Sequence, residues 1–235
     1  MTRGRVPLDR ALSKLGLASR ADARRLIREG RVAVDGTVAQ SPLRLVVPEQ
    51  VSIAIDGIAR TPRAAHRTIA FHKPRGVVTT TRDPDGRRTV FDVLGSAGDG
   101  LIAVGRLDRA STGLLILTTD TQLANRLTDP ANHIVRRYVV TVRGRVDADA
   151  VTRLVEGIDT IDTRGRHERL SATHVSIRKA SGRETHLIIE LDEGRNREIR
   201  RMLAALGHEV TRLHRIAFGA IELGNLQPGE WRPIA

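Results

Sequence analysis

The sequence predicts an α+β protein built as two domains. Near the N-terminus, two short stretches carry apolar residues at helical spacing, and strand-like alternation around an Asp-Gly pair follows them. After residue 67, short apolar runs and helical patterns alternate along the chain. Between these parts, residues 59–67 have no hydrophobic period and one proline, which predicts a linker joining domains at 5–58 and 68–235.

The composition indicates a polyanionic partner. The chain has 235 residues and a formal net charge of +12, and a basic balance of this size favours nucleic acid. Nearly all of the charge is arginine, whose planar fork suits phosphates and base edges, although genome-wide codon bias explains arginine richness equally well. Only five residues are aromatic, too few for a protein that binds by stacking many bases.

Several kinds of chemistry are excluded or not expected. The chain has no cysteine, which excludes disulfides, thiolate metal sites and cysteine nucleophiles. His167 and His174 have no partner at ligand spacing, so no metal is expected. The sequence shows no signal peptide and no apolar run of membrane-spanning length, which predicts a cytoplasmic protein with no membrane partner.

Two helices and a small sheet are predicted for the first domain. The helices cover residues 8–15 and 20–29, and a glycine follows each of them. Ser19 is expected to cap the second helix, with an acidic residue three positions later. An Asp-Gly turn predicts a hairpin over 32–38, and alternation predicts a further strand over 51–55.

The second helix carries arginines at spacings of four and three, which place them on one face. This basic ridge is either a solvated surface or a contact for RNA. The surrounding signature, L-G-L-A-S-R-A-D-A-R-R-L-I-R-E-G-R-V-A-V-D-G, resembles the αL RNA-binding module of a small-subunit ribosomal protein and some tRNA synthetases. The resemblance implies RNA contact through Arg20, Arg24, Arg25, Arg28 and Arg31.

The most informative segment is residues 105–120, G-R-L-D-R-A-S-T-G-L-L-I-L-T-T-D. Its four apolar residues, 114–117, predict a strand covered on both faces. Just before them, Asp108 stands between Arg106 and Arg109, whose charges favour an ionised carboxylate. An ionised aspartate beside a stiff strand suits a nucleophile. Taken alone, however, an aspartate beside two arginines is more often a turn residue or a surface ion pair.

This segment resembles the active-site motif of the pseudouridine synthases that modify ribosomal RNA, in the branch of the small-subunit enzyme and its large-subunit relatives. The resemblance implies that Asp108 is the nucleophile of an isomerisation that needs no cofactor. It implies a larger domain with a mixed, mostly antiparallel sheet and flanking helices. It also implies a monomer whose partner is ribosomal RNA, with large-subunit (23S) RNA favoured, met free or in ribosomal precursor particles.

Two further segments carry the resemblance. Residues 136–142 alternate like a strand, and the family's basic-x-tyrosine signature falls on Tyr138, with Arg136 where many relatives have lysine. The resemblance implies that Tyr138 stacks on the target base and assists its deprotonation, whereas core packing is the ordinary role of such a tyrosine. The sequence E-G-R-N-R-E-I-R-R-M resembles the family's third motif, which implies that Arg195 pairs with Asp108.

Other basic residues near these motifs are expected to contact RNA. K-P-R-G-V-V resembles the family's first motif, a turn between strands. A helix is predicted from Asn196 to 206, with its apolar residues on one face and arginines on the other; Glu198 in it stands where many relatives have glutamine. The RNA-binding candidates of this domain are Lys73, Arg75, Arg106, Arg197 and Arg200.

The remaining elements follow from local patterns. Strands are predicted over 68–72 and 187–189, and helices over 121–127 and from about 146 to 156. Residues 158–183 are polar and rich in turn formers, with weak strand signals only.

Two other functions fit parts of the sequence. A non-catalytic RNA-binding or ribosome-assembly factor accounts for the charge and the αL module. A synthase acting on small-subunit RNA or on tRNA accounts for the motifs as well. The joint presence of Asp108, Tyr138 and Arg195 in their motifs favours an enzyme over a passive binder.

Overall fold

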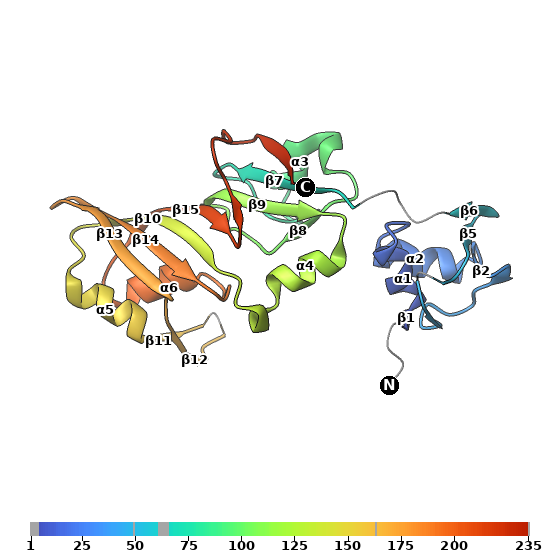
Figure 1. The fold of residues 1–235 in the computed structure, drawn as a ribbon, viewed down its shortest axis with the longest axis horizontal. Helices are drawn as coiled ribbons and strands as arrows, with labels where there is room; N and C mark the ends of the chain where they lie inside the picture. The colour runs from blue at the N-terminus through green and yellow to red at the C-terminus, as the bar shows by residue number, and fades with distance from the viewer. Residues whose placement is uncertain (1–4, 49, 61–65, 163, 235) are drawn as a thin grey trace. The chain divides into compact units, whose positions relative to one another are not determined.

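A computed structural model describes residues 5–48, 50–60, 66–162 and 164–234 of the protein. The chain divides into two compact units; the first takes in the residues up to His66 together with Thr119–Thr121, and the second takes in the rest. Both units combine helices with strands (Figure 1), which confirms the predicted α+β class.

The first unit contains the two predicted helices and a small sheet. Its elements are β1 (Val6–Pro7), α1 (Leu8–Lys14), α2 (Arg20–Arg28), β2 (Val32–Val34), β3 (Thr37–Val38), β4 (Leu45–Val46), β5 (Ile53–Ile55) and β6 (Ile58–Arg60). The Ser19 side chain accepts a hydrogen bond from the Asp22 backbone N–H at 3.1 Å, so the predicted cap of α2 is confirmed. Apolar residues of both helices pack with those of β2 and β5 into one core.

This unit has a four-stranded sheet with the strand order β3–β2–β5–β6, and two tight turns connect its strands. Asp35 and Gly36 connect β2 to β3 and have φ angles of 52° and 78°. Asp56 and Gly57 repeat this geometry between β5 and β6. Two consecutive residues with positive φ match the right-handed twist of a hairpin, and Asp-Gly tolerates them well. The predicted hairpin over 32–38 is therefore confirmed.

Strand β6 shortens the predicted linker. The sequence predicts a linker over 59–67, but Ala59 and Arg60 belong to β6 and pair with β5. All three residues of this edge strand are exposed, so it shows no apolar alternation that the sequence could reveal. Positions 61–65 of the predicted linker lie outside the described residues.

The second unit is built on one nine-stranded sheet. Its elements are β7 (Thr68–Lys73), α3 (Val90–Leu94), η1 (Gly95–Gly98), β8 (Ile102–Val104), β9 (Thr112–Thr118), α4 (Thr121–Thr128), η2 (Pro130–Asn132), β10 (Arg136–Arg143), α5 (Ala148–Glu156), β11 (Ile158–Ile161), β12 (His167–Leu170), β13 (His174–Ala180), β14 (Glu184–Leu191), α6 (Glu198–Ala205), β15 (Val210–Phe218), β16 (Ile221–Glu222) and β17 (Trp231–Ile234).

Antiparallel pairs dominate this sheet. The strand order is β13–β14–β10–β15–β9–β7–β17, with β16 beside β15 and β8 beside β9. Among the described strands of the sheet, only β9 and β15 pair in parallel, where Thr112 faces His214 and Gly113 faces Arg215. The mixed, mostly antiparallel sheet implied by the family resemblance is confirmed.

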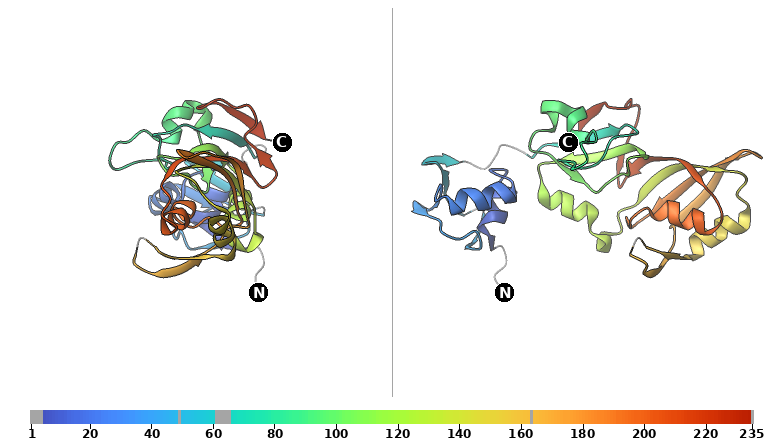
Figure 2. Two further views of the ribbon diagram at one scale, coloured as in Figure 1. Left: turned by 90° about the vertical axis from the view of Figure 1, so that its left-hand side faces the viewer. Right: turned by 180° about the vertical axis from the view of Figure 1, so that it is seen from behind.

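Strand β9 is buried on both faces, as its apolar run predicts. Leu115 and Leu117 enter the larger core of the unit, whereas Leu114 and Ile116 enter a second core on the opposite face. This division follows from the alternation of side chains along a strand. Helices α5 and α6 pack into the larger core against β10 and β14, and α4 packs into the smaller one (Figures 1 and 2).

Residues 158–183 hold more regular structure than their polar sequence predicts. Strands β11 and β12 form an antiparallel hairpin, and β13 forms an edge of the large sheet. Most side chains of β13 are exposed, so the apolar alternation of a half-buried strand is weak there. The hairpin also carries Glu168, whose carboxylate reaches the segment before α6.

We predict that Gly113→Ala disrupts the seam between β9 and β15. A Cβ at this position would lie 2.2 Å from the Arg215 carbonyl oxygen, and the residue has a φ of +106°. We expect a loss of at least about 4 kcal/mol in the free energy of unfolding, measured by urea denaturation. Gly182→Ala, where a Cβ meets nothing within 4 Å, is the control and should change stability by less than about 0.5 kcal/mol. Equal stability of the two variants would contradict this account of the seam.

Candidate active site

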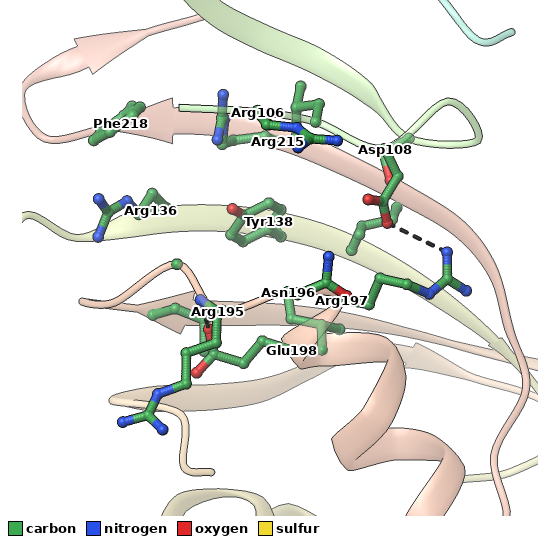
Figure 3. Close-up of a pocket in the computed structure, with 16 residues that line it drawn as sticks. Arg106, Asp108, Arg136, Tyr138, Arg195, Asn196, Arg197, Glu198, Arg215 and Phe218 are labelled. Atoms are coloured by element: carbon green, nitrogen blue, oxygen red, sulfur yellow. Dashed lines mark hydrogen bonds and ion pairs between the residues drawn. The ribbon is translucent and has the colours of Figure 1, made fainter. Parts of the chain in front are cut away.

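A cavity of about 290 Å³ opens in the second unit. The loop before β9, the start of β10, the turn before α6 and the strand β15 supply most of its wall (Figure 3). Its charged residues are Arg106, Asp108, Arg136, Arg195, Arg197, Glu198 and Arg215. Five arginines against two carboxyl groups make this a cavity that attracts anions.

Asp108 lies in this cavity wall on the loop that joins β8 to β9 (Figure 3). Its side chain is 32% exposed, so a ligand has access to the carboxylate. Its own carbonyl accepts a hydrogen bond from the Ser111 N–H at 3.0 Å, which closes a turn. The backbone is thus fixed while the carboxylate stays reachable, an arrangement that suits a nucleophile.

The segment that follows β7 holds the Asp108 loop in place. Three hydrogen bonds end on alternate carbonyls of this loop: Lys73 Nζ donates to Ser111 at 2.9 Å, the Gly76 N–H to Arg109 at 2.8 Å, and Thr79 Oγ1 to Leu107 at 2.8 Å. This is the first family motif, so its function is to fix the backbone on both sides of Asp108.

The prediction that Lys73 contacts phosphate is wrong. The Lys73 side chain is fully buried, and its amine donates to the carbonyls of Pro74 and Ser111. Burial lowers the pKa of Lys73 to about 8, although the negative charge of Asp108 opposes the shift. Arg75, in contrast, is exposed and stays a candidate for phosphate contact.

Arg197 and Arg200 are the cations that face Asp108. Arg197 Nη1 lies 3.6 Å from Asp108 Oδ2, and Arg200 Nε lies 3.9 Å from the same oxygen. Arg197 is half-exposed, whereas the Arg200 side chain is only 14% exposed and donates from Nη1 to the Val210 carbonyl at 2.9 Å. Burial lowers the pKa of Arg200, the charge of Arg197 lowers it further, and the Asp108 carboxylate raises it.

Arg195 lines the same cavity but pairs with other carboxylates, which corrects its predicted pairing with Asp108. Its Nε lies 2.9 Å from Glu193 and its Nη1 lies 2.8 Å from Glu168 on β12, and the side chain extends away from Asp108 (Figure 3). The cause is the backbone before α6, where Arg197 is the N-cap residue and has a φ of 49°. This left-handed residue redirects the chain, so that Arg197 and not Arg195 faces the aspartate.

Tyr138 lies in the cavity wall and is 8% exposed. It also belongs to the larger core, so it has the position expected for core packing and for covering a ligand in the cavity. Arg136, two residues earlier, is buried and donates to the carbonyls of Asp192 at 2.7 Å and Leu127 at 3.0 Å. Its guanidinium carbon lies 4.7 Å from the centre of the Phe218 ring, within cation–π range.

Three residues at or near this site are not predicted from the sequence: Arg215, Phe218 and Glu168. Arg215 is buried, and its Nε donates to the Leu114 carbonyl at 2.7 Å. Its guanidinium lies 5.1 Å from the Phe218 ring, so this ring contacts arginines of two strands. Glu168 pairs with one arginine of the turn before α6 and with Arg201 of the helix. An arginine in the otherwise apolar R-I-A-F end of β15 is the one signal that could have indicated Arg215.

In the first unit, acidic partners already hold most arginines of the basic ridge. The ion pairs are Arg20–Asp9 at 3.4 Å, Arg24–Asp9 at 2.7 Å, Arg25–Asp22 at 3.0 Å and Arg31–Asp56 at 2.6 Å. Arg28 donates from Nε to the Arg24 carbonyl at 3.2 Å. The paired arginines remain about half-exposed, so an RNA phosphate would have to share them with carboxylates.

Two features are absent from the described ranges. No group of three or more histidine, aspartate or glutamate side chains there could hold a metal ion. No described helix is both long and apolar enough to cross a membrane.

A reachable carboxylate that faces two arginines in the wall of a cavity has the features of a catalytic site. Comparison with known proteins identifies which kind. Residues 67–205 match the family described as RNA pseudouridylate synthase, and residues 6–51 match the S4 domain. The chain belongs to the RNA pseudouridylate synthase family, which confirms the predicted family and enzyme class.

Individual relatives cover nearly all of the chain. An uncharacterized RNA pseudouridine synthase of Aquifex aeolicus is 39% identical over 97% of this chain and 90% of its own length. Proteins named ribosomal large subunit pseudouridine synthase B from Vibrio cholerae and Yersinia pestis are 40% and 37% identical, over 97% of this chain and 71% and 72% of theirs. A crystal structure of a pseudouridylate synthase superposes with a TM-score of 0.65, at 28% identity, over 98% of this chain and 96% of that one.

We predict that Lys73→Met impairs the Asp108 loop and leaves phosphate binding unchanged. The buried amine supports the Ser111 carbonyl, so we expect a loss of about tenfold in turnover, since small misplacements of a catalytic group are costly. The slope of RNA affinity against salt should not change. Arg75→Met is the matched variant, and loss of one phosphate contact should reduce that slope by about 1. If Lys73→Met reduced the slope of RNA affinity against salt, Lys73 would contact a phosphate, and the conclusion drawn from its burial would be wrong.

Proposed function

We propose that this enzyme converts a uridine of large-subunit ribosomal RNA into pseudouridine, with Asp108 as the nucleophile. The observation that carries the proposal is the reachable Asp108 carboxylate, whose Oδ2 lies 3.6 Å from Arg197 and 3.9 Å from Arg200. Relatives named for the large ribosomal subunit support the choice of substrate over small-subunit RNA or tRNA.

The reaction breaks the bond from the ribose C1′ to N1 of uracil and forms a bond from C1′ to C5. N1 gains a proton and C5 loses one, so the atoms balance within one nucleotide and no cofactor is required. Asp108 either attacks C1′ or removes the neighbouring ribose proton; both routes need an ionised carboxylate. Two arginines within 4.0 Å of the Asp108 carboxylate orient it.

The detached base must stay in place while it rotates. Tyr138 in the cavity wall is our candidate for covering the ring and assisting loss of the C5 proton. A cavity of about 290 Å³ suits one flipped-out nucleotide and not a stacked helix. Extrusion of a base costs a few kcal/mol, which arginine contacts to the flanking phosphates offset.

RNA contact is assigned to exposed arginines of both units. In the second unit, Arg75, Arg106 and Arg197 are exposed, and Arg106 lines the cavity. In the S4 domain, the basic ridge supplies further contacts. We infer that the enzyme acts as a monomer in the cytoplasm, on free ribosomal RNA or on precursor particles.

We predict that Asp108→Asn abolishes pseudouridine formation and changes RNA affinity by less than about tenfold. The amide keeps the shape of the side chain and removes its nucleophilic charge. Mapping of pseudouridines in ribosomal RNA from cells that carry the wild-type gene, the variant or no gene measures the outcome and identifies the target. Asp159→Asn, at an exposed ion pair with Arg169, is the control and should stay active. A modified uridine in the Asp108→Asn cells would refute the assigned nucleophile.

We predict unequal effects of two arginine variants. Arg200→Gln removes a nearly buried cation close to Asp108, so the rate of the chemical step should fall by about a hundredfold. Arg195→Gln removes only half-exposed ion pairs with glutamates and should lower the rate by about threefold at most. Single-turnover kinetics at saturating enzyme separate this step from RNA binding. The reverse order of effects would reinstate Arg195 as the partner of Asp108.

A further inference from the structure

Glu198 is a buried carboxyl group that the proposed mechanism does not use. It is the first residue of α6 and is 3% exposed, and it lines the same cavity as Asp108 (Figure 3). Its Oε2 accepts a hydrogen bond from the Arg195 backbone N–H at 3.0 Å. Its Oε1 is buried and receives no hydrogen bond from any residue that the structure describes.

The arginine whose backbone N–H binds Glu198 directs its side chain to other carboxylates. The guanidinium of Arg195 is engaged with Glu193 and Glu168. The carboxyl group of Glu193 also interacts with Glu198, in the direction that raises the pKa of Glu198. Two carboxyl groups in such contact share one proton, because two negative charges there repel each other.

The groups around Glu198 favour its neutral form. The pKa of Glu198 is raised to about 8, first by burial and then by the hydrogen bond and the charge of Glu193. The Arg195 N–H and its positive charge act in the opposite direction. Arg136, on β10, also interacts with Glu198 electrostatically, but it is held by backbone carbonyls.

We propose that Glu198 is a positioning residue that works as a neutral carboxylic acid, donating to Glu193 and accepting from the Arg195 backbone, and so fixes the turn that aims Arg197 at Asp108. The inference rests on the proposed function, since Arg197 and Asp108 are the pair being positioned. Glu198 closes the chain from residue 193 to the first turn of α6, and Arg197 stands immediately before it with left-handed backbone.

Ionisation of Glu198 should therefore inactivate the site. A second negative charge beside Glu193, in a side chain with almost no access to water, is repelled by Glu193 and favours opening of the turn. Opening moves Arg197 away from Asp108. The amide of glutamine offers the same donor and acceptor as the neutral acid and does not ionise.

The test is single-turnover pseudouridine formation from pH 6 to pH 9.5 by the wild type, Glu198→Gln, Glu198→Ala and Glu193→Gln. At pH 7, the glutamine variant of Glu198 should be at least about tenfold faster than the alanine variant, because it keeps both hydrogen bonds. Between pH 7 and pH 9, the wild type should lose about tenfold more of its activity than Glu198→Gln. In Glu193→Gln, the loss of activity should occur at lower pH than in the wild type, because the substitution removes the negative charge that favours the neutral form of Glu198. Glu209→Gln, at an exposed pair with Arg143, is the control and should follow the wild type.

Burial also lowers the pKa of Lys73 to about 8. Lys73 is present in all of these proteins, so its effect on activity is the same in the wild type and in each variant. Equal losses by the wild type and Glu198→Gln at pH 9 would overturn the proposal. The proposal would also be overturned if Glu198→Gln were no faster than Glu198→Ala at pH 7. The reaction would then require the carboxylate itself and not the two hydrogen bonds that glutamine keeps.

Thermal unfolding tests the protonation state without any RNA. An acid with a pKa of about 8 in the fold and an ordinary value of 4.5 when unfolded stabilises fully below 4.5, and this stabilisation is lost as the pH rises to 8. The melting temperature of Glu198→Gln relative to the wild type should thus rise between these two values and then level off. A constant difference would refute the neutral acid. If the wild type modified no ribosomal RNA, the proposed function would fail while this measurement still decided the state of Glu198.

Discussion

The attraction between Asp108 and the arginines at the start of α6 is the interaction on which the second unit depends. The carboxylate comes from the loop before β9, and the cations come from the segment after β14. Strands β10 and β15 lie between β14 and β9 in one sheet, and this strand order sets the distance across which the two segments meet. The parallel seam of β9 and β15 requires Gly113, because a Cβ there collides with the Arg215 backbone. Behind the carboxylate, Lys73 and its segment fix the loop. Each of these features reduces the freedom of one charged group.

The two units hold their arginines in opposite ways. In the S4 domain, carboxylates pair with most of the basic ridge, so much of its charge is compensated before RNA arrives. Around the cavity, Arg136, Arg200 and Arg215 donate to backbone carbonyls. Carbonyl partners orient a guanidinium and satisfy its donors without cancelling its charge. The cavity therefore keeps an excess of positive charge, which favours a bound phosphodiester.

Local signals in the sequence were sufficient where a residue type has one strong conformational preference. Asp35-Gly36 fixes a hairpin, Ser19 caps α2, and the apolar run of β9 predicts burial on both faces. The motif resemblance placed Asp108 and Tyr138 in one cavity. It failed for Arg195, because the direction of each side chain before α6 depends on a left-handed φ at an arginine, a residue type that seldom adopts it. It failed for Lys73 because burial follows from the path of neighbouring segments, which no local pattern contains.

The cavity wall combines five arginines with a carboxyl group that we infer to be neutral, and the two facts are connected. An ionised Glu198 would be a second anion beside the turn of Arg197, and it would compete with Asp108 for the same guanidinium. Neutralisation by a proton removes this competitor at no cost in packing, because the acid keeps its hydrogen bond to the Arg195 N–H. Sharing the proton with Glu193 leaves one negative charge on the pair, and Arg195 pairs with Glu193. The turn thereby separates its charges: Arg195 balances the two glutamates, and Arg197 stays available to Asp108.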